Sequence, residues 1–169
     1  MNPMRAPRRH TQSGVMLIEA LIGILIFSVG ILALIGMQAA AMRGVSDARY
    51  RTEAAQFAND LLTNVVLNVD RTSDATIQTS LAAFAHQASG TNCAFSGAAS
   101  ANAMVTGWVA NVTGTTAGAR PPLPGATSAM QQVVVDTSSG SFNRITITLC
   151  WKSPEDAVAR RHSLTSFIN

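Results

Sequence analysis

Glu19 is the side chain whose type and position most clearly suggest a chemical role. It is the one charged residue in an apolar run of 23 residues, from Val15 to Met37. A formal charge inside a bilayer costs on the order of 2.5–3.5 kcal/mol on insertion scales. We therefore expect this carboxylate to have a cationic partner, to lie at the membrane edge, or to serve a function that offsets its cost.

The other residues that could do chemistry are isolated in the sequence. His10, His86 and His162 lie far apart, Cys93 and Cys150 lack a C-x-x-C spacing, and there is no glycine-rich phosphate loop. No clustering of serine, histidine and aspartate suggests a nucleophile with its base. We expect no enzymatic activity, no cofactor and no metal.

The apolar run is long enough to cross a membrane, because about 20 helical residues span the hydrocarbon core. Arg5, Arg8 and Arg9 precede it, and no acid occurs among the first 18 residues. Basic residues beside a span stay on the cytoplasmic side. The N-terminus is therefore predicted to be cytoplasmic, and the chain after Met37 to lie outside the cytoplasm.

The charge of the chain does not indicate a nucleic-acid partner. Of its 12 basic residues, three precede the apolar run, and the nine that follow are matched by nine acidic residues. The high isoelectric point, near 9.5, is thus largely a property of the N-terminal arginines. A neutral body lacks the basic surface that binding to nucleic acid requires.

Cys93 and Cys150 lie in the part of the chain that this topology exports. Cysteines in an oxidising compartment tend to pair. A bridge closing a loop of this length would contribute roughly 3–5 kcal/mol in the chain-entropy model. We predict one disulfide, the alternative being two free buried thiols, which fits only a cytoplasmic domain.

The hydrophobic pattern predicts one long helix. No proline occurs between Pro7 and Pro121. Beyond the apolar run, one apolar stripe recurs at steps of three and four residues, as expected for an amphipathic helix: Ala54, Ala58, Leu61, Val65 and Val69. A continuous helix from about Met16 to about Asn68 would be roughly 80 Å long.

Three glycines, Gly23, Gly30 and Gly36, lie inside the apolar part of this helix. Each is less favourable there than alanine by roughly 0.8–1 kcal/mol. Small residues also allow close approach between helices in a membrane. Both readings stay open, ordinary membrane-helix glycines or packing positions, and Gly36 is also a candidate for local loosening of the helix.

The rest of the chain predicts a small α+β head. Ile77 to Ala85 suggests a short helix ending near Gly90, Ser96 to Asn102 a loop, and Met104 to Val112 a third helix. An irregular, proline-containing connection from 114 to 127 follows.

Toward the C-terminus, Gln131–Asp136 is rich in valine and Asn143–Trp151 alternates apolar and polar residues, which predicts a hairpin. Arg161–Ile168 can supply a third strand, so we predict an antiparallel sheet of about three strands. A sheet with one apolar face needs a cover, and the outer half of the long helix has the matching stripe.

The junction between the basic segment and the apolar run carries a family resemblance. Gly14-Val15-Met16-Leu17-Ile18-Glu19, after a basic leader, resembles the class III signal of type IV pilins and type II secretion pseudopilins. An ordinary secretory signal has a shorter apolar region and is cut after it. The resemblance implies cleavage after Gly14 by a prepilin peptidase, methylation of the new amino group of Val15, and retention of the membrane helix.

Further segments, among them 28–38 and Ala54–Asn59, look like those of PilV-type minor pilins. This resemblance implies a pilin-like fold with a leader at 1–14, a membrane or filament-core helix at 15–37, an amphipathic half at 38–69 and an exported head at 70–169. The implied function is that of a minor pilin in a priming or tip complex that initiates a type IV pilus, used in adhesion and twitching motility.

The implied partners are other minor pilins, the major pilin, the prepilin peptidase and methyltransferase, the inner-membrane assembly platform and a tip adhesin. The implied location is the inner membrane, crossed once, and then the pilus at the cell surface. In that family the glutamate corresponding to Glu19 pairs with the N-terminus of a neighbouring subunit during assembly.

Several alternatives remain at this point. Glu19 would otherwise be an acid that snorkels to the cytoplasmic face of the membrane. The chain would otherwise be a minor pseudopilin of a type II secretion system, or a single-span anchor carrying a periplasmic binding domain. Arg160 and Arg161 are expected to form a solvated strand edge, with a partner-binding patch as the alternative.

Overall fold

The computed structural model describes residues 15–116 and 120–169. The predicted leader, including Gly14, lies outside the described residues. The chain divides into two compact units, residues 1–46 and 47–169. The first consists, in its described part, of helix alone, and the second is the head.

Helix α1 spans Val15–Asn68, 54 residues without a break. The predicted long helix is confirmed. Between residues 47 and 53 its exposed surface carries ion pairs one turn apart, Arg49 to Glu53 at 2.8 Å and Arg51 to Asp47 at 3.0 Å. Such pairs add a few tenths of a kcal/mol each to an exposed helix.

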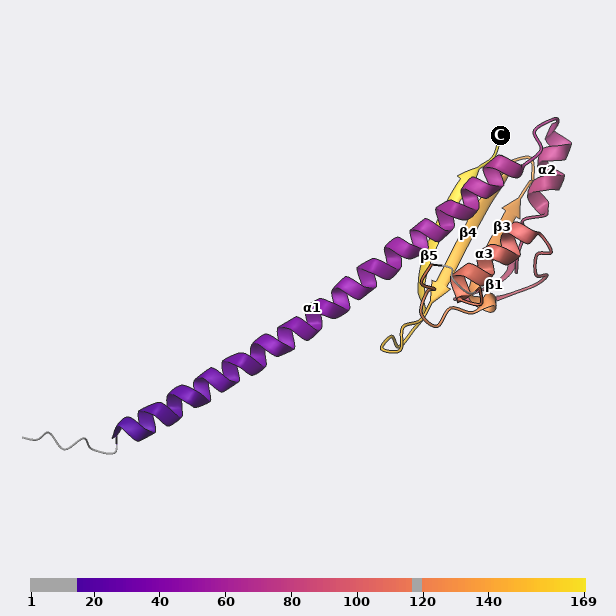
Figure 1. The fold of residues 1–169 in the computed structure, drawn as a ribbon. Helices are drawn as coiled ribbons and strands as arrows, with labels where there is room; N and C mark the ends of the chain where they lie inside the picture. The colour runs from indigo at the N-terminus through magenta and orange to yellow at the C-terminus, as the bar shows by residue number, and fades with distance from the viewer. Residues whose placement is uncertain (1–14, 117–119) are drawn as a thin grey trace, which may run out of the picture. The chain divides into compact units, whose positions relative to one another are not determined.

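The head contains a three-stranded antiparallel sheet in the order β3-β4-β5. The strands are β3 (Gln131–Asp136), β4 (Arg144–Trp151) and β5 (Arg160–Phe167), close to the predicted boundaries. Val133 lies opposite Ile147, which in turn lies opposite Leu164. Figure 1 shows β4 between β3 and β5.

One face of this sheet, which we call the inner face, carries most of its apolar side chains. Because successive residues of a strand point to opposite faces, the register places these residues on it: Val133, Val135, Ile145, Ile147, Leu149, Trp151 and Leu164. The four on β4 have no exposed surface. The opposite, outer face has hydroxyl pairs instead, such as Thr146 with Thr165 at 3.2 Å.

The outer half of α1 covers the inner face. Its buried residues are Ala54, Phe57, Ala58, Leu61 and Val65, which include four members of the stripe that periodicity predicts. They form one core cluster with the inner face of the sheet. The protein is therefore α+β, with a long helix packed on a small antiparallel sheet.

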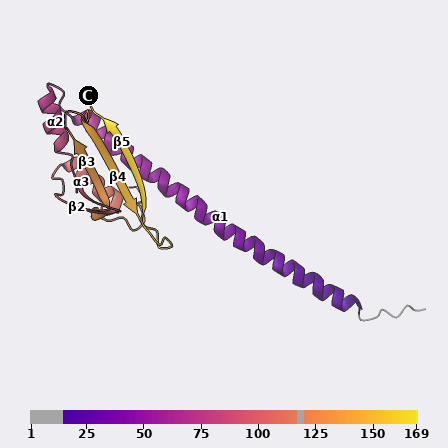
Figure 2. The ribbon, with the colours of Figure 1, turned by 180° about the vertical axis from the view of Figure 1, so that it is seen from behind.

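Two short helices complete this core (Figure 2). Helix α2 spans Asp74–Ala82 and begins with a capping box between Ser73 and Thr76. It ends well before Gly90, because after Ala82 the chain enters a turn that places Phe84 in the core. Helix α3 spans Ala103–Thr113, as predicted, and ends at Gly114 in the left-handed conformation.

A small hairpin was not predicted. Strands β1 (Ser89–Thr91) and β2 (Ala94–Ser96) pair antiparallel where the sequence suggested a helix end and the start of a loop. The turn between them uses positive φ angles at Asn92 and Cys93. A single turn of 3-10 helix, η1 (Ser128–Met130), leads into β3.

The predicted disulfide joins this hairpin to the sheet. Cys93, in the hairpin turn, is bonded to Cys150 on β4, 57 residues later in the chain. Cys150 is fully buried and, by alternation with Leu149 and Trp151, belongs to the outer face. The hairpin is thus anchored on the side of the sheet away from α1.

His86 ties the segment before the hairpin to β3. Its backbone exchanges two hydrogen bonds with Val133, at 2.9 and 3.0 Å. Its ring Nδ1 accepts a hydrogen bond from the backbone N–H of Ser100 at 3.1 Å, which requires this nitrogen to be unprotonated. Burial lowers the pKa of His86, and the backbone of Ser128 opposes this shift.

We predict that replacing Leu61 by alanine destabilises the head by about 2–5 kcal/mol, because a fully buried leucine leaves a cavity. Leu67, on the same helix, is 73% exposed. Leu67→Ala is the matched control and should change stability by no more than about 0.5 kcal/mol. The measurement is denaturant unfolding in detergent, followed by the fluorescence of the two tryptophans. Equal effects of both substitutions would contradict the packing described.

We also predict that the head loses stability in mild acid through His86. Because the folded-state pKa lies below the unfolded value of about 6.5, the unfolded chain takes up the proton first. The contribution is complete above that value and is lost as the pH falls toward the folded pKa. Unfolding midpoints at pH 7.5 and pH 5 should differ less in His86→Gln than in the wild type. An unchanged difference would remove His86 as the cause.

Candidate functional site

The apolar part of α1 is the first candidate site. Every large hydrophobic side chain from Val15 to Met37 is between 41% and 71% exposed, and none of the most apolar 18-residue window is buried in the chain. By length and composition the segment can cross a membrane. A helix that is apolar on all sides needs a nonaqueous environment or a partner.

Glu19 lies in the second turn of this segment. No side chain in the described ranges, 15–116 and 120–169, forms an ion pair with it. The positive end of the helix dipole favours an acid near the helix N-terminus. A cation that neutralises Glu19 would therefore lie outside the described residues of this chain.

The three glycines of the apolar segment are not required by contacts within this chain. A Cβ atom added at Gly23, Gly30 or Gly36 would have nothing within 4 Å among the atoms of the described residues. Each glycine nevertheless weakens the helix relative to alanine. Contacts within the described part of the chain therefore do not explain why these positions are glycine. Close packing against a helix of another chain, which the sequence suggested, is compatible with the structure.

Val15, the residue that would carry the new amino group, is the first residue of α1 and is 64% exposed. Gly14, its partner in the predicted cleavage site, lies outside the described residues. A cut between them would place the amine one helical turn from Glu19, since residues four apart are neighbours on a helix.

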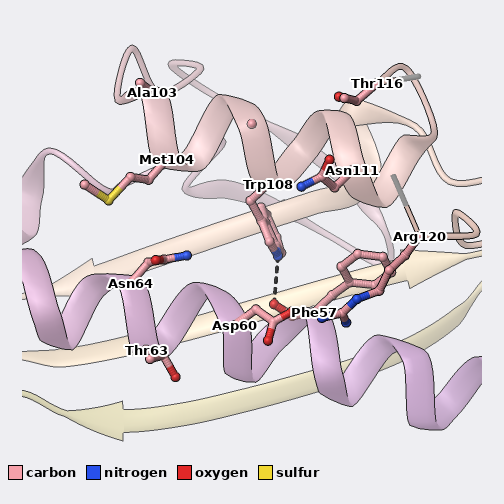
Figure 3. A pocket seen from close by; sticks show the side chains of 11 residues that line it. Phe57, Asp60, Thr63, Asn64, Ala103, Met104, Trp108, Asn111, Thr116 and Arg120 are labelled. Carbon is pink, nitrogen blue, oxygen red and sulfur yellow. Dashed lines mark hydrogen bonds and ion pairs between the residues drawn. The ribbon is translucent and has the colours of Figure 1, made fainter. Parts of the chain in front are cut away.

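A groove in the head is the second candidate site, and it was not among the sites predicted from the sequence. It has a volume of about 770 Å³ and lies between α1 and α3, and Figure 3 shows side chains from both helices lining it. Its lining includes Asp60 and Asn64 on α1 and Met104, Gly107 and Asn111 on α3. Residues so far apart in the chain share no local motif.

The two helices are fixed to each other beside the groove. The indole N–H of Trp108 on α3 donates a hydrogen bond to the backbone carbonyl of Phe57 on α1 at 2.9 Å (Figure 3). Arg120 forms an ion pair with Asp60 at 2.7 Å, and its guanidinium lies 5.5 Å from the centre of the Phe57 ring. Both aromatic rings are 5% exposed or less.

Of the two arginines singled out on the last strand, Arg160 has ion-pair partners within the head. Arg160 pairs with Asp156 at 2.8 Å and lies 3.3 Å from Asp47 of α1, so it joins the sheet edge to the helix. The hydrogen bond from Arg160, together with its charge, lowers the pKa of Asp156. Within the described part of the chain no cluster of three or more histidine, cysteine or acidic residues could hold a metal ion.

No protein-family model matches this sequence, and no curated protein or solved structure matches it either. Function is therefore inferred from the residues and their placement.

Proposed function

We propose that this chain is a minor pilin of a type IV pilus, inserted in the inner membrane, cut after Gly14, and used in a priming or tip complex. The observation that carries the proposal is the junction itself: three arginines, Gly14, and then a long exposed apolar helix whose one charge is Glu19. The fold, a long helix on a small antiparallel sheet with a disulfide, is compatible with a pilin-like layout.

In this proposal Glu19 pairs with an amine that forms only when the leader is cleaved. Cleavage before Val15 removes the arginines and creates a cationic amine four residues from the acid. A buried ion pair is not by itself strongly stabilising, but a buried charge without its partner costs several kcal/mol. Pairing of Glu19 with the amine of a neighbouring subunit would therefore favour one axial register over its alternatives.

The exposed apolar segment suits a subunit that changes surroundings. Before assembly its side chains would contact lipid, and in a filament they would contact the corresponding helices of other subunits. Both surroundings are apolar, so the transfer needs no refolding of α1. The glycines would then be positions where a neighbouring helix approaches closely.

The proposal makes the chain a substrate of an enzyme and not an enzyme. Its partners would be other minor pilins, the major pilin, the peptidase that also methylates Val15, the assembly platform and a tip adhesin. The head would lie in the periplasm before assembly and at the cell surface afterwards.

Mass spectrometry of the membrane fraction tests the processing step. We predict a mature chain that begins with N-methylated Val15. Gly14→Glu should block the cut, since the peptidase must approach the backbone at this residue closely, whereas Gln12→Glu, two residues earlier, adds the same charge and should be processed. An intact leader on the wild-type chain in cells with an active peptidase would support a plain membrane anchor instead.

Replacing Glu19 by glutamine tests the register mechanism. The head core uses residues from Ala54 onward, so Glu19→Gln should leave protein level, disulfide formation and leader cleavage unchanged. The number of pili should fall toward that of the deletion strain, because the neighbour's amine loses its charge partner. Pili are counted by electron microscopy after shearing.

Ser28→Ala is the matched control, because it changes a polar residue of the same segment without removing a charge. Normal pilus numbers in the Glu19→Gln strain, with the variant present in the pili, would make Glu19 a snorkelling edge residue. A deletion strain that keeps its pili and motility but loses protein secretion would assign the chain to a type II secretion system.

A further inference from the structure

The groove between α1 and α3 has the features of a binding site that the proposed function does not use. Its volume of about 770 Å³ falls within the range of roughly 300–1,000 Å³ common for ligand sites. One wall comes from the part of α1 that follows Phe57, and the other from α3. Both walls are rigid helices that the Trp108 hydrogen bond holds together.

Two carboxamides line this groove from opposite walls. Asn64 comes from α1 and Asn111 from α3, and both reach the space between the helices in Figure 3. Neither side chain forms a hydrogen bond with any of the described residues, and because Asn64 is exposed and Asn111 half-buried, both carboxamides are open to solvent and to a ligand. Other asparagines on α1 bond the backbone of their own helix, as Asn59 does to Ala55 and Asn68 to Asn64.

At Gly107, which lines the groove, no side chain occupies the space beside α3. This glycine lies in the interior of α3, where it is less favourable than alanine by roughly 0.8–1 kcal/mol. Apart from the adjoining backbone of α3 itself and the two neighbouring residues, a Cβ atom added there would meet nothing within 4 Å among the described residues. Ala103, one turn earlier, is also small, so this side of α3 leaves room for another backbone to approach closely.

The charged and aromatic side chains beside the groove argue against several classes of ligand. Saccharide sites commonly offer an open aromatic face, but Trp108 and Phe57 are buried and Arg120 lies over the Phe57 ring. An anion would need a free cation, and Arg120 is already paired with Asp60. A helix satisfies its own backbone groups, so it would leave the two carboxamides unpaired unless its side chains reached them.

An extended polypeptide is the class of ligand that best fits the groove. Its backbone offers one N–H and one C=O at each residue, and a carboxamide both donates to and accepts from such groups. The exposed Met104 and the small residues of α3 can contact an apolar side chain of modest size. We propose that this groove binds an extended peptide segment of a partner protein through its main chain, with Asn64 and Asn111 as the hydrogen-bonding residues.

Selection from a phage-displayed library of linear heptapeptides tests this inference on the full chain in lipid nanodiscs. Enriched peptides are synthesised and their dissociation constants measured by fluorescence anisotropy. We expect Asn64→Ala to weaken binding by about tenfold, as loss of a hydrogen bond to a desolvated group does. Asn59→Ala, on the same helix outside the groove, should leave the affinity unchanged.

Gly107→Leu places a side chain in the groove and should abolish binding. Leucine is a better helix former than glycine, so thermal unfolding should show that this variant folds at least as stably as the wild type. N-methylation of a central peptide bond in the bound heptapeptide should also weaken binding about tenfold, which separates main-chain recognition from a side-chain contact.

Three results would overturn the inference. The first is a library that enriches no peptide. The second is a set of enriched peptides that bind Gly107→Leu as well as the wild type. The third is binding of oligosaccharides from a glycan array that Gly107→Leu abolishes, which would assign the groove to a saccharide. None of these results bears on cleavage at Gly14 or on the role of Glu19.

Discussion

The contact between the buried stripe of α1 and the inner face of the sheet is the interaction on which the rest of the head depends. A sheet of three short strands is barely stable unless its apolar face is covered, and an amphipathic helix gains most of its stability from packing of its apolar side. Leu61 and Val65 belong to one buried cluster with Ile145, Ile147 and Leu149 of β4. The other elements attach to this pair: α3 through Trp108, the hairpin through Cys150.

This arrangement places an unusual demand on one helix. From Ala54 onward α1 must present an apolar stripe to the sheet and polar residues to water, whereas from Val15 to Met37 it is apolar on all sides. The two requirements do not conflict, because a helix satisfies its backbone hydrogen bonds internally in water and in lipid alike. Side chains alone adapt each half to its surroundings.

Much of this fold could be predicted from local patterns. Periodicity places the long helix, α3 and β4, because their apolar residues recur at the spacing of the element they form, and a run of three valines indicates β3. The hairpin was missed because Ser89, Gly90 and Ala94 have low strand propensity, and tertiary contacts hold it in place. Gln132 reaches across to the carbonyls of Gln87 and Ser89, and the disulfide fixes the turn.

One of the two candidate sites could be predicted from the sequence and the other could not. The junction at Gly14 and Glu19 is contiguous, so its chemistry can be read from the spacing of a few residues. The groove is not, because Asn64 and Asn111 come together only through the packing of α3 on α1. An unpaired carboxamide also has no sequence signature, since whether it finds a partner depends on its neighbours in space.

The position of the disulfide has a mechanical consequence. A load applied between α1 and β5 would pass from the end of the helix to Cys93, across the sulfur atoms to Cys150, and on to β5. The 57-residue separation that the bond closes, equivalent to about 190 Å of extended chain, is bypassed. Tension could peel β5 from β4 or draw out the segment between α1 and Cys93, but it could not draw out α3 or β3 while the bond is intact, so the length of chain between the two cysteines would not be released.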